Sequence, residues 1–248
     1  MMSPTAVFPK LIEHLFGTRS ARDLVAEPLP ERFARRDGSW NGRPLVLETR
    51  AFEGQGFRLR LAEVRSDAAM ESLTVLFLPP RESALPIFGA DVVAFAGTLS
   101  AVIVDVTPKG PWLPRPNVVK AKEMLESSGT VRAFSSDSET PFSPEVVFVQ
   151  PRAGSSTSLL SGFSEMVRAW DSSAGSEFLD AKAAALAEDA YLAKLALVKR
   201  QAKVVSKLFG AHWTEGYFQC FFSPDISAYS ANVLASSIPP LSSERHLP

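Results

Sequence analysis

Five apolar segments with β-strand character follow one another between Pro44 and Val106, and only short turns separate them. The segments cover residues 45–49, 57–62, 73–78, 92–95 and 99–106. Glycine, proline and aspartate mark the turns, at residues 53–56, 66–67, 79–81 and 96–97. Strands joined this closely run antiparallel, because a parallel crossover needs about a dozen residues or more. This stretch is therefore predicted to form an antiparallel sheet.

The sequence on either side has helical character. Helices are predicted at residues 10–24, 118–126, 159–170 and 177–209, and one more strand at 146–149. The longest of these helices is rich in alanine, repeats apolar residues at spacings of three and four, and ends at Gly210. We predict one α/β domain over residues 1–224, with an antiparallel sheet covered by helices. Residues 225–248 are rich in serine and proline, and we expect this tail to be partly disordered.

Composition argues against several classes of function. The 26 Lys and Arg residues nearly balance the 27 Asp and Glu residues, unlike in a general nucleic-acid binder. The single cysteine, Cys220, cannot form an internal disulfide, a four-cysteine zinc site or an iron–sulfur cluster. We expect Cys220 to be a packing residue. Any electrons for redox chemistry must then come from another molecule.

Motifs for common cofactors and nucleophiles are also missing. Residues 54–56 carry two glycines of a dinucleotide-binding loop, but Leu59 stands where the third is needed. The three histidines are far apart and lack metal-ligand spacing, and the serines of residues 155–158 lack a nucleophile-elbow frame. We therefore expect no bound cofactor and no metal.

The N-terminus lacks a basic segment followed by an apolar run, so a secretory signal is not expected. The longest apolar stretch, residues 92–104, is shorter than the roughly 20 residues of a transmembrane helix. We expect a soluble protein without membrane contact, in the cytoplasm, or in the plastid stroma if a transit peptide has been removed.

Asp91 is the most informative single residue. It stands at the start of the apolar segment 92–95, and it should share a face with Val93 and Phe95. Apolar surroundings disfavour the charged carboxylate and raise its pKa, which suits a proton donor at neutral pH. A structural alternative, in which Asp91 caps a turn after Gly89, remains open from the residues alone.

Residues 85–93, Leu-Pro-Ile-Phe-Gly-Ala-Asp-Val-Val, resemble the central motif of the ferredoxin-dependent bilin reductases. Further segments resemble the family in the same order along the chain, over roughly residues 20–224. They are the Pro-Leu-Pro-Glu of residues 28–31, the basic strand at 57–60, the strand end at 77–79, the Asp-containing strand exit at 104–108 and the closing helix at 208–218.

The resemblance implies a three-layer α/β/α sandwich with a central antiparallel sheet, and biliverdin held between the sheet and the C-terminal helices. It implies reduced ferredoxin as the electron donor, without flavin or metal. It also implies that Asp91 is the essential aspartate, which protonates the bilin and starts its reduction through a radical.

Two positions depart from the family pattern. Thr74 aligns where some branches have histidine and others asparagine, and Lys199 aligns where a second aspartate stands in branches that reduce twice. These departures favour a single two-electron reduction of biliverdin IXα to 15,16-dihydrobiliverdin. The alternatives are a four-electron reduction to phycoerythrobilin or phycocyanobilin, a bilin-binding protein without catalysis, and an interaction domain that binds no bilin.

Basic residues are candidates for contacts with the substrate and the electron donor. The propionates of biliverdin call for Arg or Lys, since a guanidinium pairs bidentately with a carboxylate. The candidate substrate contacts are Arg58, Arg60, Phe88, Arg152, Lys199 and Arg200; Arg58 and Arg60 could face solvent instead. Arg200, Lys203 and Lys207 form a basic stripe, and Lys203 and Lys207 are the candidates for docking an acidic ferredoxin. The alternative is that this stripe is the solvated face of an amphipathic helix. A lyase or a second bilin reductase is a further conceivable partner.

Overall fold

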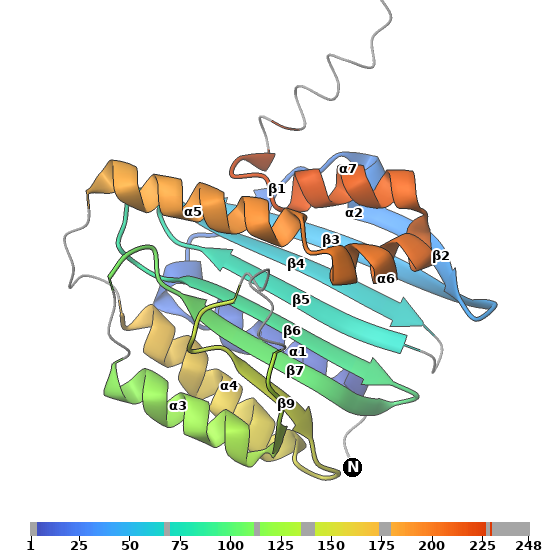
Figure 1. Ribbon diagram of the computed structural model, residues 1–248, viewed down its shortest axis with the longest axis horizontal. Coiled ribbons are helices and arrows are strands. Elements are labelled where there is room, and N and C mark those ends of the chain that lie inside the picture. Colours follow the sequence, from blue (N-terminus) through green and yellow to red (C-terminus); the bar gives the residue numbers. More distant parts are fainter. Residues whose placement is uncertain are drawn as a thin grey trace, which may run out of the picture.

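The computed structural model describes residues 4–66, 70–111, 115–134, 142–173, 180–226 and 229, without the side chains of residues 4–6 and 199–201. The described residues form one nine-stranded antiparallel sheet in the order β1-β3-β4-β5-β6-β7-β9-β8, with β2 also paired to β3 (Figure 1). The strands are β1 (Val25–Glu27), β2 (Arg35–Trp40), β3 (Arg43–Gly54), β4 (Phe57–Ser66), β5 (Met70–Leu78), β6 (Ile87–Phe95), β7 (Thr98–Thr107), β8 (Gly129–Val131) and β9 (Val147–Pro151).

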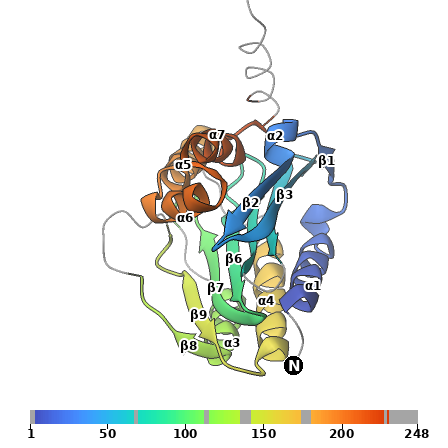
Figure 2. The ribbon, with the colours of Figure 1, turned by 90° about the vertical axis from the view of Figure 1, so that its right-hand side faces the viewer.

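Helices cover both faces of this sheet (Figure 2). One layer contains α1 (Pro4–Phe16), α3 (Pro116–Ser127) and α4 (Ser156–Asp171). The other contains α5 (Ala181–Ala196), α6 (Lys199–Phe209) and α7 (Ala211–Phe221), with the single-turn α2 (Glu31–Ala34). The predicted three-layer α/β/α sandwich with a central antiparallel sheet is confirmed.

Strand alternation divides the apolar residues between two cores. On β6, Phe88 and Val92 pack toward α1, α3 and α4, whereas Ile87 and Val93 pack toward α5, α6 and α7. A β-bulge interrupts the pairing of β6 with β7, since Val93 pairs with Ala101 and Ala94 with Leu99. Leu99 therefore packs toward α1, α3 and α4, whereas Ala101, two positions along, lies on the opposite face with its partner Val93.

Tight turns connect the central hairpins where the sequence predicts them. Gln55 and Gly56 have φ values of 50° and 79°, and Ala96 and Gly97 have φ values of 47° and 74°. Two successive residues with positive φ make the two-residue turn whose twist matches that of antiparallel strands.

The predicted helix over residues 177–209 is wrong in one respect, because α5 ends at Ala196 and α6 begins at Lys199. No glycine or proline marks this break. Tertiary packing accounts for it, since α6 turns to lie against β2. There Gly38 approaches so closely that a Cβ atom would come within 2.5 Å of the Leu208 carbonyl oxygen.

Sequence analysis also missed β1, β2, α2 and β8, which are short or lie near the sheet edges. Most of the tail at 225–248 lies outside the described residues, although Ile226 is described and buried. In the described part of the chain, no helix has the length and apolar character needed to cross a membrane.

Candidate functional site

Asp91 and Thr74 lie directly opposite each other on the neighbouring strands β6 and β5. The Thr74 hydroxyl Oγ1 donates a hydrogen bond to Asp91 Oδ1 over 2.7 Å. Both side chains belong to the face that packs toward α5, α6 and α7, because Asp91 alternates with Ala90 and Val92 and shares its face with Val93. The structure thus brings the two predicted catalytic residues into contact.

The sheet is closed on one face of this region and partly open on the other. Ala90, Val92 and Val104, on the face toward α1, α3 and α4, are all buried. On the opposite face, a group of neighbouring residues is only half-buried. We call this group the Asp91 strip; its members are Thr74, Gly89, Asp91, Val93 and Ile103. A molecule that approaches from the side of α5, α6 and α7 can therefore reach Asp91.

Burial raises the pKa of the Asp91 carboxyl above its ordinary value, and the hydrogen bond from Thr74 opposes this rise. Desolvation dominates because the apolar floor of the sheet favours the uncharged acid. Asp91 thus combines access from one side with a preference for the protonated form, which are the two properties required of a proton donor.

The motif before Asp91 is anchored from the opposite helix layer. Trp170 of α4 donates its indole Nε1–H to the Pro86 carbonyl oxygen over 2.7 Å, and both residues are buried. Phe88 packs edge-on against Phe163, with ring centroids 5.8 Å apart, and is fully buried. The expectation that Phe88 shares a ligand with Asp91 is therefore corrected, since alternation places the two side chains on opposite faces of the sheet.

Arg58 and Arg60 of β4 lie on the Asp91 face, but neither faces solvent. Arg58 donates to Glu188 Oε1 of α5 over 2.8 Å and to the Pro224 carbonyl oxygen over 2.8 Å. Arg60 donates to the Phe221 carbonyl oxygen at the end of α7. Burial and the neighbouring Arg58 lower the pKa of Arg60 to about 10. Both guanidinium groups thus tie α5 and the end of α7 to the sheet, a role that differs from the predicted substrate contact.

Glu188 is a buried carboxylate that no sequence pattern pointed to. It is fully buried on α5 and accepts hydrogen bonds from Arg58 and, over 3.3 Å, from Lys109 Nζ. Burial lowers the pKa of Lys109, and the charge of Glu188 opposes this shift. No local pattern signals this network, because its members lie up to 130 positions apart.

A second buried carboxylate, Asp105 of β7, also lies on the Asp91 face, across the strand from Gly89. It accepts from Thr107 Oγ1 over 2.7 Å and from the Ser143 backbone N–H over 3.1 Å. Tyr191 of α5 hydrogen-bonds with Thr107, and burial and the charge of Asp105 raise its pKa. No sequence pattern pointed to Tyr191, and Asp105 was noted only within the strand exit at 104–108. Asp105 nevertheless shares a signal with Asp91, because both are acidic residues in an apolar strand, between Val104 and Val106 and between Ala90 and Val92.

The remaining predicted contacts lie away from Asp91 or outside the described side chains. Arg152 is exposed and donates to the Ser127 carbonyl oxygen at the end of α3. Lys199 and Arg200 are in the first turn of α6, and their side chains are not among those described. Lys203 and Lys207 are exposed on α6, as docking by an acidic partner would require.

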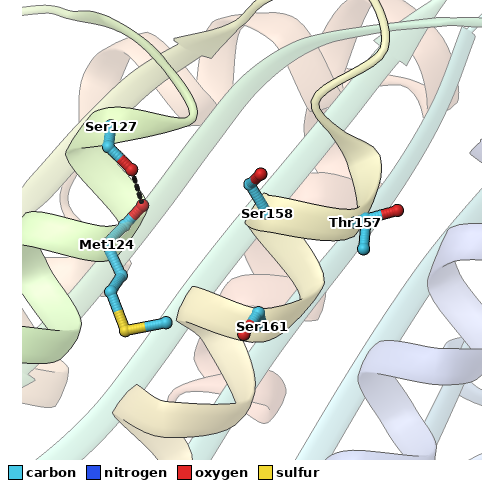
Figure 3. Close-up of a pocket in the computed structure, with 5 residues that line it drawn as sticks. All are labelled: Met124, Ser127, Thr157, Ser158 and Ser161. Carbon is cyan, nitrogen blue, oxygen red and sulfur yellow. Dashed lines mark hydrogen bonds between the residues drawn. The ribbon is translucent and has the colours of Figure 1, made fainter.

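A hollow of about 360 Å³ lies between α3 and α4, on the far side of the sheet from Asp91 (Figure 3). Hydroxyl side chains and Met124 line it; Ser127 donates to the Met124 carbonyl oxygen over 2.7 Å. No charged side chain is among its lining residues, and none of them is a member of the Asp91 strip. Among the described residues, no three His, Cys, Asp or Glu side chains gather as a metal ion would need.

Comparison with known proteins gives a consistent result. The family model for ferredoxin-dependent bilin reductases matches residues 13–223. The phycocyanobilin:ferredoxin oxidoreductase of Prochlorococcus marinus (strain MIT 9303) is 29% identical over 195 residues, which cover 73% of this chain and 72% of the relative. The enzyme of the same name from Synechococcus sp. (strain CC9902) is 33% identical over 120 residues, 46% of this chain and 47% of the relative.

The fold also matches a solved structure. Phytochromobilin synthase from tomato, in complex with biliverdin, superimposes with a TM-score of 0.67 over 91% of this chain and 84% of the synthase chain, at 18% sequence identity. At this identity the match establishes a shared fold, which is the α/β/α sandwich described above.

Proposed function

This chain belongs to the ferredoxin-dependent bilin reductase family, and from that premise we propose that it reduces biliverdin IXα by two electrons to 15,16-dihydrobiliverdin, as a step of phycobilin biosynthesis. The chain is an oxidoreductase of linear tetrapyrroles. The observation that carries the proposal is the contact between Thr74 and Asp91 on a half-buried strip, where the pKa of Asp91 is raised. The tomato synthase of the same fold, which was solved with biliverdin, supports the choice of substrate.

The chemistry assigned to this chain is proton delivery. Reduction of one carbon–carbon double bond consumes two electrons and two protons, and ferredoxin supplies the electrons singly. Asp91, whose carboxyl pKa is raised by burial, donates one proton to the pigment on the half-buried face of β6. We assign the second proton to solvent, since the Asp91 strip is only half-buried. Thr74 holds Asp91 Oδ1 and so directs the carboxyl group.

Two residues support a reduction that stops after two electrons. Thr74 stands beside Asp91 where an imidazole or an amide would stand in other branches, and a hydroxyl cannot act as an acid at neutral pH. Lys199 stands where branches that reduce twice carry a second aspartate. Asp91 is then the residue that matches a proton donor of the family. We therefore expect reduction of one double bond, at the bridge beside the D ring.

A four-electron reduction to phycocyanobilin is the second candidate. It is favoured by the names of the relatives, which are phycocyanobilin:ferredoxin oxidoreductases. In that case a further acid on the Asp91 face must compensate for Thr74 and Lys199, and Asp105 is buried on this face.

Ferredoxin is the proposed partner at α6, where Lys203 and Lys207 are exposed. A basic helix face suits an acidic electron carrier, because complementary charge steers the encounter. A lyase or a second bilin reductase that consumes the product is a further proposed partner. We propose the cytoplasm, or the plastid stroma after removal of a transit peptide, as the location.

Incubation with biliverdin IXα, ferredoxin and ferredoxin reductase without oxygen tests the proposal. The expected result is a change in the visible spectrum and one product, identified as 15,16-dihydrobiliverdin by chromatography. Asp91→Asn, which keeps the acceptor atom for Thr74, is expected to lower the rate at least about 100-fold. Phycocyanobilin as the end product would replace the two-electron proposal with the four-electron one. Bound but unchanged pigment would identify a bilin-binding protein instead.

A further inference from the structure

Gly89 leaves open space on the face of β6 that carries Asp91. A Cβ atom built at Gly89 would meet, among the described residues beyond its chain neighbours, only the Tyr191 hydroxyl oxygen, at 3.5 Å. By contrast, a Cβ atom at Gly38 or Gly54 would come within 2.5 Å and 2.1 Å of backbone oxygens. Glycine inside a strand often marks a place where another group approaches the backbone closely. At Gly89, the Tyr191 hydroxyl is the one described group beyond the chain neighbours that lies within 4 Å of the Cβ position, at an ordinary contact distance.

The Tyr191 hydroxyl forms a hydrogen bond with Thr107, whose own hydroxyl donates to Asp105 Oδ2. A phenol group carries one proton and two lone pairs. Whichever hydroxyl donates in the bond between Tyr191 and Thr107, the Tyr191 oxygen keeps a lone pair. Tyr191 Oη can therefore accept a hydrogen bond from a group that lies over Gly89.

Gly89 and Asp91 are two residues apart on one strand, so their positions differ by about 7 Å along β6. The face thus presents an acceptor at Tyr191, unsubstituted backbone at Gly89 and, two residues further along β6, the carboxyl group of Asp91. A flat ring with an N–H donor on its edge fits this arrangement, because it can lie against the backbone and donate to Tyr191.

We propose that Gly89 and Tyr191 position the substrate: a pyrrole ring of a linear tetrapyrrole lies over Gly89 and donates its N–H to Tyr191 Oη, which brings the adjacent part of the pigment to Asp91. This inference rests on the proposed bilin substrate and adds the residues that set its place. Asp105 and Thr107 act through Tyr191, since Thr107 hydrogen-bonds with both the Tyr191 hydroxyl and Asp105.

Gly89→Ala tests whether the ligand lies against the backbone at Gly89. Alanine suits a strand, and the added methyl group would make an ordinary contact with Tyr191, so the unfolding midpoint should stay unchanged or rise. The Kd for biliverdin IXα, measured by absorbance titration, should rise at least about tenfold because the ring loses its place on the backbone. Equal Kd values for Gly89→Ala and the unsubstituted protein would overturn this part of the inference.

Tyr191→Phe tests the acceptor, and Tyr217→Phe is its matched control. Tyr217 is also buried against a threonine, with 3.1 Å between its hydroxyl and Thr49 Oγ1, but it lies over β3, which β4 and β5 separate from the Asp91 strand β6. Tyr191→Phe should shift the absorbance spectrum of bound biliverdin and lower kcat/KM about tenfold, or about 1.4 kcal/mol. Tyr217→Phe should change neither quantity.

The outcomes separate this inference from the proposed function. If the unsubstituted protein neither binds nor reduces biliverdin, the proposed function falls and the inference falls with it. If that protein is active and Tyr191→Phe matches it in spectrum and kcat/KM, only the inference falls. The same conclusion follows if Tyr217→Phe loses as much activity as Tyr191→Phe.

Discussion

The Thr74 hydroxyl donates to Asp91 Oδ1 across strands β5 and β6, and this hydrogen bond opposes the effect of burial on the Asp91 carboxyl. The acid is therefore tuned by two local influences of opposite sign. Burial comes from the sheet and favours the proton, whereas Thr74 favours the carboxylate.

Replacing Thr74 should move the pH dependence of catalysis. Thr74→Val keeps the shape of the side chain but removes the donor, so the pKa of Asp91 should rise further. Because the protonated acid is the active form, the decline of kcat on the alkaline side should move to higher pH. Thr74→Ser keeps the hydroxyl and should retain the original profile. An unchanged alkaline limb in Thr74→Val would show that this hydrogen bond does not tune the acid.

Asp91→Asn should abolish reductase activity and change how the unfolding free energy depends on pH. A carboxyl whose pKa is raised by folding binds its proton more tightly in the folded state, so its contribution to stability falls as pH rises from 3.8 toward the raised value. The asparagine variant has no such carboxyl, so its unfolding free energy lacks this decrease with pH. The difference in unfolding free energy, variant minus unsubstituted protein, should therefore increase with pH in urea titrations, while reductase activity is lost. A difference that is constant with pH would contradict the raised pKa.

Glu188→Gln should destabilise the fold strongly. It leaves Arg58 and Lys109 buried without their counter-charge, which costs about 3–5 kcal/mol in comparable buried pairs. The neighbouring Asp189→Asn is the control, because its ion pair with Arg81 is partly exposed and is worth about 0–1 kcal/mol. Urea unfolding of both variants measures the contrast. Similar losses of unfolding free energy in the two variants would show that burial does not determine how much the Glu188 network stabilises the fold.

Charge reversal on α6 should weaken the use of ferredoxin. Lys203→Glu with Lys207→Glu is expected to raise the KM for ferredoxin at low salt, with less effect at high salt, because screening weakens surface attraction. The affinity for biliverdin should stay unchanged. Lys120→Glu, on the exposed side of α3 in the opposite helix layer, is the charge-matched control. An equal rise of KM in the control would show a general effect of charge rather than docking at α6.

The central hairpins and the acid could be predicted because their signals are local. Period-two alternation and turn residues specify antiparallel strands from Pro44 to Val106, whatever packs on them. An aspartate beside valines predicts a raised pKa in any sheet that buries it, as found for Asp91. The spacing that places Asp91 opposite Thr74 follows from the length of the connection between their strands.

The sequence by itself thus determined the central hairpins of the sheet, most of the helices and the identity of the buried acid, since each depends on neighbours within a few positions. Only the tertiary structure decided which partners the buried charges find. Arg58 meets Glu188 across 130 positions, Tyr191 reaches the space above Gly89, and Phe88 falls on the far face. The break between α5 and α6 is of the same kind, because packing of α6 against β2 outweighs the helical propensity of the residues at the break. These contacts depend on how the helices pack on the sheet, and no local sequence pattern specifies that packing.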